Sequence, residues 1–327
     1  MRAVAVVAVV WALAGTAAAR PREVAVTVGA DPQYPLGGTL TLPDGPGPFP
    51  AVVLVHGSGP SDRDETVGAT RMFADLAAGL AARGIAVLRY DKRTFTYGDR
   101  LTNDLTLDDE VIADAVDAIT TLHQRSEIDA SRIIVVGHSL GGMLAPEIAT
   151  RAGHVAGVAM LAPPARPPLD ILRDQLRYLG APAELRSSVE QAAIVDALPL
   201  PLPTTEPIYV LGMPMTYWRD WERHDGIAAA RALGKPILII QGGRDYQVTA
   251  ADLALWKKGV PHAMFMWLPA DNHALIAGRG RPGPREYAHE GHVDARAIAK
   301  LAAFVQGSDT TCTTCADTVS RTRRPSK

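Results

Sequence analysis

The chain has 327 residues, of which 47% are hydrophobic and 21% are charged, a composition typical of a globular protein. Its formal net charge of −2 and isoelectric point of about 6.5 exclude the strongly basic character of most nucleic-acid-binding and membrane-surface proteins. A folded chain of about 300 residues buries roughly three quarters of its unfolded surface, so stability requires neither disulfides nor metal ions.

The first 19 residues have the composition of a secretory signal peptide. Arg2 supplies a positive charge, Ala3 to Leu13 form an apolar run, and small residues at 15–19 suit a signal peptidase. The run is shorter than the about 20 apolar residues that a membrane span needs, with an uncleaved anchor as the alternative. We therefore expect residues 1–19 to be removed, the mature protein to be secreted or periplasmic, and no membrane span to follow.

From residue 20 onward the pattern favours an α/β fold. Glu23 to Val28 and Thr39 to Leu42 are expected to form an antiparallel pair joined through Gly37 and Gly38. Apolar stretches then alternate with helical patterns, which is typical of a parallel sheet buried on both faces. The predicted strands are Ala51 to Val55, Ile85 to Arg89, Arg132 to Val136, Val155 to Leu161, Pro236 to Ile240 and His262 to Leu268. The predicted helices are Met72 to Ala82, Val111 to Leu122, Leu140 to Thr150, Ala251 to Lys258 and His292 to Val305.

An insertion interrupts this alternation at 165–229. It begins in the proline-rich segment Pro163 to Pro168, and prolines fit neither a helix interior nor a central strand. Because the alternation resumes afterwards, we expect a helical cap over the carboxyl ends of the strands, between core segments 20–164 and 230–307. A second independent domain is the alternative.

The last segment, 308–327, is rich in Thr and Ser and is expected to be a flexible tail. It contains Cys312 and Cys315, which could close a small disulfide in an exported protein. Two cysteines without further ligands nearby make a poor zinc site. No metal or organic cofactor is therefore expected.

The strongest signal for chemistry is Gly137-His138-Ser139-Leu140-Gly141, which follows a predicted strand and opens a predicted helix. This arrangement is the G-x-S-x-G nucleophile elbow, in which a sharp turn lifts the serine hydroxyl above the sheet. The two glycines are needed because side chains there would collide with the neighbouring strand and helix. The sequence therefore predicts Ser139 as a catalytic nucleophile.

With this elbow, the segments His56-Gly57-Ser58-Gly59-Pro60 and Arg89-Tyr90-Asp91-Lys92-Arg93 resemble the α/β-hydrolase superfamily over residues 23 to 307. They are similar to bacterial serine aminopeptidase-like and dienelactone hydrolase-like esterases. The resemblance implies an oxyanion hole formed by the backbone amides of Leu140 and Ser58. Losing one such donor typically costs about 10²–10³ in rate.

The resemblance also implies an acid after a late strand and a histidine after the last strand. Asp245 follows the strand that ends at Ile240, whereas Asp252 is expected to be exposed on the next helix and Asp225 lies in the cap. His273 follows the final strand, with His289 and His292 as alternatives. The chain order Ser139, Asp245, His273 is the order typical of this fold.

These residues predict a serine hydrolase that cleaves carboxylic esters of small or medium acyl groups, with Tyr217, Trp218 and Trp221 of the cap binding an apolar group. Two alternatives stay open: a peptidase or amide hydrolase on the same triad, and a non-catalytic binding protein. The expected partner is a small-molecule acyl substrate, not a nucleic acid. The charges of Arg63, Lys92 and Arg93 are expected to form ion pairs that hold the loops, with substrate-carboxylate recognition as the alternative.

Overall fold

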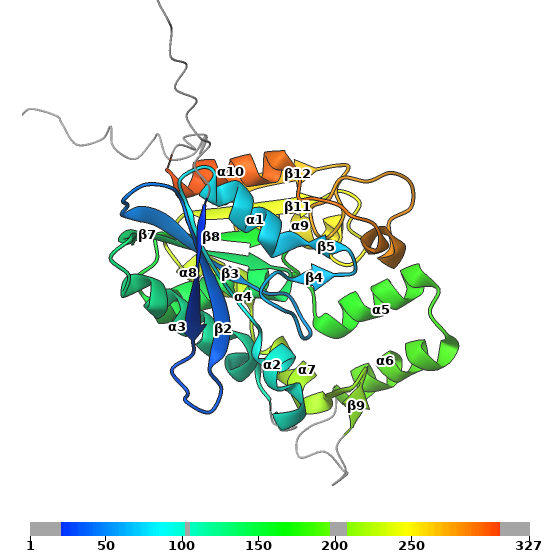
Figure 1. Ribbon diagram of the computed structural model, residues 1–327. Coiled ribbons are helices and arrows are strands. Elements are labelled where there is room, and N and C mark those ends of the chain that lie inside the picture. Colours follow the sequence, from blue (N-terminus) through cyan, green and yellow to red (C-terminus); the bar gives the residue numbers. More distant parts are fainter. Residues whose placement is uncertain (1–20, 102–104, 197–207, 308–327) are drawn as a thin grey trace, which may run out of the picture.

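The computed structural model describes residues 21–101, 105–196 and 208–307, and the predicted α/β class is confirmed (Figure 1). The expected signal segment 1–19 and tail 308–327 lie outside these ranges. One sheet has the order β1-β2-β6-β3-β7-β8-β11-β12. Its strands are β1 (Arg22–Val28), β2 (Leu36–Leu42), β3 (Phe49–Val55), β6 (Ala86–Tyr90), β7 (Ile128–His138), β8 (Gly157–Leu161), β11 (Ile237–Gly242) and β12 (Met264–Leu268). The strands from β6 to β12 in this order are parallel, whereas β2 is antiparallel to both of its neighbours.

The expectation that Gly37 and Gly38 form the first turn is wrong. Both lie inside β2, where Gly37 pairs with Thr27 and Gly38 pairs with Val26. A Cβ on Gly37 would lie 2.6 Å from the guanidinium of Arg63, so the missing side chain lets that arginine cross the strand. The turn itself is built around residues 29–35.

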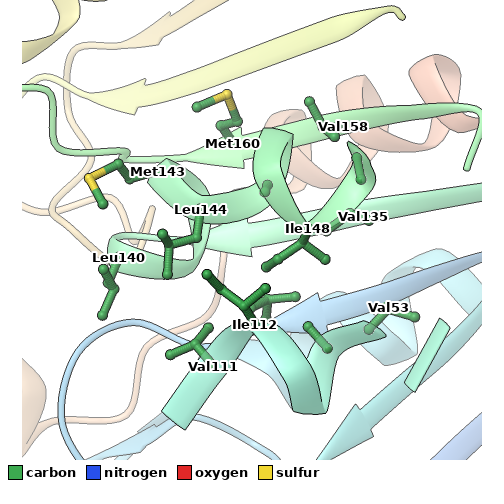
Figure 2. Close-up of a cluster of buried hydrophobic side chains, with 14 of the residues drawn as sticks. Val53, Val111, Ile112, Val135, Leu140, Met143, Leu144, Ile148, Val158 and Met160 are labelled. Carbon is green, nitrogen blue, oxygen red and sulfur yellow. The ribbon is translucent and has the colours of Figure 1, made fainter. Parts of the chain in front are cut away.

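Two helical layers cover the sheet. Helices α1 (Met72–Ala81) and α10 (Ala295–Val305) pack on one face, with Leu76 and Leu301 in the same buried cluster as Val52. On the other face lie α3 (Ala113–His123), α4 (Leu140–Ala152), α8 (Gly226–Ala232) and α9 (Ala250–Gly259). Figure 2 shows Ile148 of α4 between Val135 and Val158 of the sheet and Ile112 of the neighbouring helix. Strands β3, β6, β8 and β11 are buried on both faces along almost their whole length, which explains the continuous apolar runs in the sequence.

The insertion after β8 lies beyond the carboxyl ends of the strands, in the green helices of Figure 1. It contains α5 (Pro168–Leu179), α6 (Ala183–Asp196), β9 (Tyr209–Val210), β10 (Met213–Pro214) and α7 (Met215–Glu222). The helix that follows, α8, packs against α4 and α9 instead. Gly226 permits this contact, because a Cβ there would lie 2.7 Å from the carbonyl oxygen of Met143. Asp225, weighed as an acid in the sequence, caps α8 by accepting from Ala228 N–H at 2.9 Å.

Shorter elements complete the described chain. They are β4 (Thr66–Val67), β5 (Thr70–Arg71), α2 (Arg93–Tyr97), the 3₁₀ turns Gly98–Arg100 and Pro284–Ala288, and the π-helical turn Asp108–Ile112. None of the helices in the described ranges has the length and apolar character needed to span a bilayer.

Candidate active site

Four parallel strands bring distant residues to one edge of the sheet. The loops after β3, β7, β11 and β12 contain, respectively, Ser58, Ser139, Asp245 and His273. Since these strands run in the same direction, their carboxyl ends meet at the same edge, where ligands bind in open α/β sheets.

Ser139 occupies a strained turn between β7 and α4. Its φ of 51° and ψ of −119° lie outside the regions that ordinary residues adopt. The backbone is held by two bonds, since Ser139 N–H donates to the carbonyl of Leu161 at 2.8 Å and its own carbonyl accepts from Met143 N–H at 3.0 Å. The side chain is half-buried and takes part in lining a cavity. This turn therefore presents an accessible hydroxyl at the edge of the sheet.

The two glycines of the elbow are required by close backbone contacts. A Cβ on Gly137 would lie 2.1 Å from the carbonyl oxygen of Gly141, and a Cβ on Gly141 would lie 2.4 Å from that of Val55. Backbone atoms cannot move aside as a flexible side chain can. The tight approach of α4 to β3 and β7 thus depends on these two positions.

Asp245 and His273 form a buried pair. The distance between His273 Nδ1 and Asp245 Oδ2 is 2.6 Å, and both residues are 7% exposed. Because the carboxylate accepts, Nδ1 carries the proton and Nε2 keeps its lone pair, which is the tautomer needed for a general base.

Further donors orient the carboxylate of Asp245. Its Oδ1 accepts from the N–H groups of Gln247 at 2.8 Å and Val248 at 2.9 Å. Its Oδ2 also accepts from Gln241 Nε2 at 3.0 Å. Gln241 lies on β11 and is fully buried. Sequence analysis did not single it out, although a glutamine in an otherwise apolar strand is a signal that a buried polar partner is nearby.

Two adjoining cavities share Ser58, Ser139, Gln247 and His273. The larger, about 260 Å³, is also lined by Glu65, Tyr246 and Tyr287. The smaller, about 100 Å³, lies under the cap and is lined by the apolar residues Ile171, Leu172, Trp218 and Trp221. The nucleophile and base predicted from the sequence therefore open onto one bipartite space.

The loop after β3 is held by buried charges. Gly57 N–H donates to Glu65 Oε1 at 2.8 Å, and Lys92 Nζ donates to the carbonyls of Gly57 at 2.8 Å and Gly59 at 3.0 Å. His56 anchors the loop through a hydrogen bond from Nε2 to the carbonyl of Asp62 at 3.1 Å. Burial lowers the pKa of His56 to about 4, so its ring is neutral at pH 7.

A family model described as the alpha/beta hydrolase family matches residues 52–307, which include the elbow, the loop after β3 and the Asp245–His273 pair. The chain belongs to the alpha/beta hydrolase family.

Individual relatives of this alpha/beta hydrolase carry esterase names. "Esterase EstD" of Thermotoga maritima is 46% identical over 275 residues, which are 83% of this chain; the match spans 65% of that protein's length. The structure is similar to that of Est1E from Butyrivibrio proteoclasticus with bound ferulic acid, with a TM-score of 0.59, 16% identity, and coverage of 86% and 99% of the two chains. It is also similar to an esterase domain from Rhodothermus marinus, with a TM-score of 0.53, 20% identity, and coverage of 88% and 98%.

The structure separates the three aromatic residues predicted for the cap of this hydrolase. Trp218 and Trp221 stack with ring centroids 6.0 Å apart and line the smaller cavity with Ser139. Tyr217 does not line either cavity among the described residues; it is 3% exposed, and its hydroxyl donates to Glu110 at 2.8 Å. Successive residues of a helix point in different directions, so neighbours in sequence need not share a site.

The other histidines and the aspartate weighed for the triad make contacts away from it. His289 is exposed, and His292 pairs with Asp75 of α1 at 3.0 Å on the surface. The expectation that Asp252 is exposed is wrong. It is fully buried, and its carboxylate is compensated there by hydrogen bonds. It accepts from Arg166 Nη2 at 3.0 Å and from the N–H of Thr249, the residue that caps α9.

The charged loops form ion pairs, as expected. Arg63 Nη2 lies 2.5 Å from Asp91, and Arg93 Nη2 lies 2.6 Å from Asp114. Lys92 is paired with Glu110 at 2.8 Å, with each side chain 2% exposed. Because buried charges need partners, these contacts explain the charges at the edge of the sheet without a substrate carboxylate.

A second carboxylate–histidine pair, Glu65 and His138, lies beside the triad residues and was missed by sequence analysis. Glu65 Oε2 lies 3.0 Å from His138 Nδ1, with side chains 6% and 9% exposed. His138 Nε2 donates to the carbonyl of His273 at 3.1 Å. The sequence gives little sign of this pair, because Glu65 stands in a run of charged residues of the kind usually found on a protein surface.

Proposed function

We propose that this chain is a serine hydrolase that cleaves carboxylic esters through an acyl-enzyme. The observation that carries the proposal is the buried Asp245–His273 pair opening onto the same cavity as the strained, half-buried Ser139. Ser139 would be the nucleophile and His273 the general base. Asp245 would hold the tautomer and stabilise the imidazolium.

We assign the oxyanion hole by asking which backbone N–H groups near Ser139 already have hydrogen-bond acceptors. Gly57 N–H is bound to Glu65, Gly141 N–H to the carbonyl of His56, and Ser139 N–H to that of Leu161. Leu140 is the first residue of α4, where N–H groups lack an intrahelical acceptor. Ser58 lies between the two carbonyls that Lys92 holds, and it is exposed to the cavity. The amides of Leu140 and Ser58 are therefore the donors we assign to the developing oxyanion.

The reaction then proceeds in two stages. As Ser139 Oγ attacks the ester carbonyl carbon, His273 Nε2 takes the hydroxyl proton. The tetrahedral intermediate collapses with loss of the alcohol, which receives that proton, and leaves an acyl group on Ser139. Water, deprotonated by His273, then attacks the acyl carbonyl carbon, and His273 returns that proton to Ser139 Oγ as the acid leaves.

The substrate proposal rests on the cap. The smaller cavity, about 100 Å³, is lined by Ile171, Leu172, Trp218 and Trp221 and suits a small apolar group. The larger cavity carries the polar groups of Glu65 and Tyr246 and suits the remainder of the substrate. The name of the Thermotoga maritima relative supports an ester over an amide.

A substrate panel on the purified protein tests this function. p-Nitrophenyl esters of increasing acyl length, set beside aminoacyl anilides, should show turnover of short esters and little turnover of anilides. Ser139→Ala is the matched control, and a fluorophosphonate probe should label only the unsubstituted protein. Faster turnover of the anilides would favour the peptidase alternative, and absence of labelling would favour a non-catalytic binding protein.

We also propose export to the periplasm or medium. The charge, apolar run and small residues of segment 1–19 support it. Expression of the full chain with sequencing of the mature N-terminus tests it, with cleavage near residue 19 expected. Cytoplasmic protein that keeps the segment would contradict it.

A further inference from the structure

The Glu65–His138 pair contacts three separate loops of the proposed active site. Glu65 Oε1 accepts from Gly57 N–H in the loop after β3. His138 is the residue that precedes Ser139 in the elbow, and its Nε2 donates to the carbonyl of His273. The pair therefore links the oxyanion loop, the nucleophile turn and the loop of the base.

The contacts of the two ring nitrogens of His138 indicate which of them carries a proton. A carbonyl oxygen only accepts, so His138 Nε2 carries a proton. On the other side, Nδ1 faces Glu65 Oε2 at 3.0 Å, and two lone pairs at that distance would repel. A proton on one of the two atoms removes this repulsion, and their contact is then a close charge contact rather than a well-directed hydrogen bond. Burial alone would lower the pKa of His138, but the charge of Glu65 outweighs it and raises that pKa, while His138 lowers the pKa of Glu65. The proton thus resides on His138.

No other charged group near the pair neutralises Glu65 or His138 in place of its partner. His56 faces Glu65 but is neutral at pH 7. Lys92 is neutralised by Glu110, and the carboxylate of Asp245, which also acts on the charge of His138, is bound to His273. Glu65 itself adopts φ +49°, a left-handed conformation unusual for a glutamate. Such strain is maintained only where surrounding contacts demand it.

We propose that Glu65 and His138 form a second charged pair, an imidazolium and a carboxylate, that positions the oxyanion loop against Ser139 and keeps a positive charge beside the ring of His273. Both are positioning residues, and their role rests on the proposed function. The ring centroids of His138 and His273 are 4.7 Å apart, so the positive end of the pair is the end nearer the base. A cation there disfavours a second positive charge on His273.

The decisive experiment measures the rate of Ser139 labelling by a fluorophosphonate as a function of pH, which requires no knowledge of the natural substrate. Glu65→Gln keeps an oxygen for Gly57 N–H but removes the negative charge, so the buried ring of His138 becomes neutral. We expect the acid limb of the labelling profile to move up by about 0.5 pH unit and the plateau rate to fall about 10-fold. A merely structural glutamate would leave the acid limb unmoved.

A matched control exists in the chain. Glu147 and His224 form another glutamate–histidine pair, 2.7 Å apart, that does not line either cavity with Ser139. Glu147→Gln should leave the acid limb and the plateau rate of the labelling profile as they are in the unsubstituted protein. His138→Gln, which leaves Glu65 charged and unpaired, should move the limb upward more than Glu65→Gln and serves if the latter does not fold.

Side-chain ¹⁵N NMR measures the protonation state of the His138 ring directly. At pH 6 His138 should show two protonated nitrogens in the unsubstituted protein and one in Glu65→Gln. A neutral His138 at that pH, or unchanged acid limbs in both variants, would overturn the proposal. Failure of the unsubstituted protein to label would instead contradict the serine hydrolase function, so the two failures are distinguishable.

Discussion

The two walls of the cavity are built by different physical means. On the sheet side, the groups we assign to chemistry are fixed by short polar contacts: Asp245 binds His273 at 2.6 Å, and Gly57 binds Glu65 at 2.8 Å. On the cap side, Trp218 and Trp221 offer stacked apolar rings beside Ile171. Polar contacts specify geometry to fractions of an ångström, whereas apolar packing tolerates substitution. Changes to the sheet wall should therefore lower turnover, most strongly at the catalytic groups, and changes to the cap wall should alter substrate preference.

The largest effect should come from Ser139→Ala. Removing the nucleophile should lower kcat by about 10⁴–10⁶, as measured by ester hydrolysis. Folding should persist, because the backbone of Ser139, rather than its hydroxyl, makes the bonds to Leu161 and Met143. A variant that folds and keeps a tenth of the activity would remove Ser139 from the mechanism.

Asp245→Asn should be the next most severe change. An amide cannot accept at both of its ends, so contacts to Gln247, Val248 and His273 cannot all be kept, and the tautomer of His273 is no longer enforced. We expect kcat to fall by about 10³–10⁴ with a smaller change in KM. Equal activity of the variant at any pH between 6 and 9 would argue for a different orienting group.

Trp218→Ala tests the cap wall. Loss of the ring should reduce kcat/KM about 10- to 100-fold for butyrate or longer esters and less for acetate, since the pocket loses apolar contact in proportion to acyl length. The measurement is the ratio of kcat/KM along the acyl series. A uniform loss across the series would mean that Trp218 supports the fold rather than the substrate.

The stability of the sheet wall should depend on pH through Glu65 and His138. The pKa of Glu65 is lowered from 4.5 and that of His138 is raised from 6.5 in the folded protein. The contribution of Glu65 is present above pH 4.5 and lost as pH falls through its lowered pKa. That of His138 is present below pH 6.5 and lost as pH rises through its raised pKa. The Tm difference between the unsubstituted protein and Glu65→Gln should therefore be largest between pH 4.5 and 6.5.

The smallest effect on turnover should come from Tyr217→Phe. The variant loses the hydroxyl bond to Glu110, which keeps its partner Lys92. Stability should fall by about 1–2 kcal/mol in denaturant unfolding, with KM for short esters unchanged. A fall in kcat/KM that grows with acyl length, as expected for Trp218→Ala, would instead show that Tyr217 contacts the substrate.

The residues predicted from the sequence differ in how local their signals are. The elbow could be predicted because its glycines, serine and flanking strand and helix lie within one short segment. Asp245 and His273 could be placed only through the family resemblance, which implies an acid after a late strand and a histidine after the last one, and the structure joins the two side chains. Tyr217 and Asp252 were misjudged because the direction of a side chain on a helix depends on what packs against it.

Periodicity and short motifs in this chain determined the α/β class, the alternation of strands and helices, and the position of the elbow, since these depend on neighbours a few residues apart. Only the tertiary structure decided the partners of buried charges. Glu65 meets His138 across 73 positions of sequence, and His138 meets the carbonyl of His273 across 135. No local pattern encodes such pairs, because burial and the opposing charge arise only when the loops at the carboxyl edge of the sheet come together.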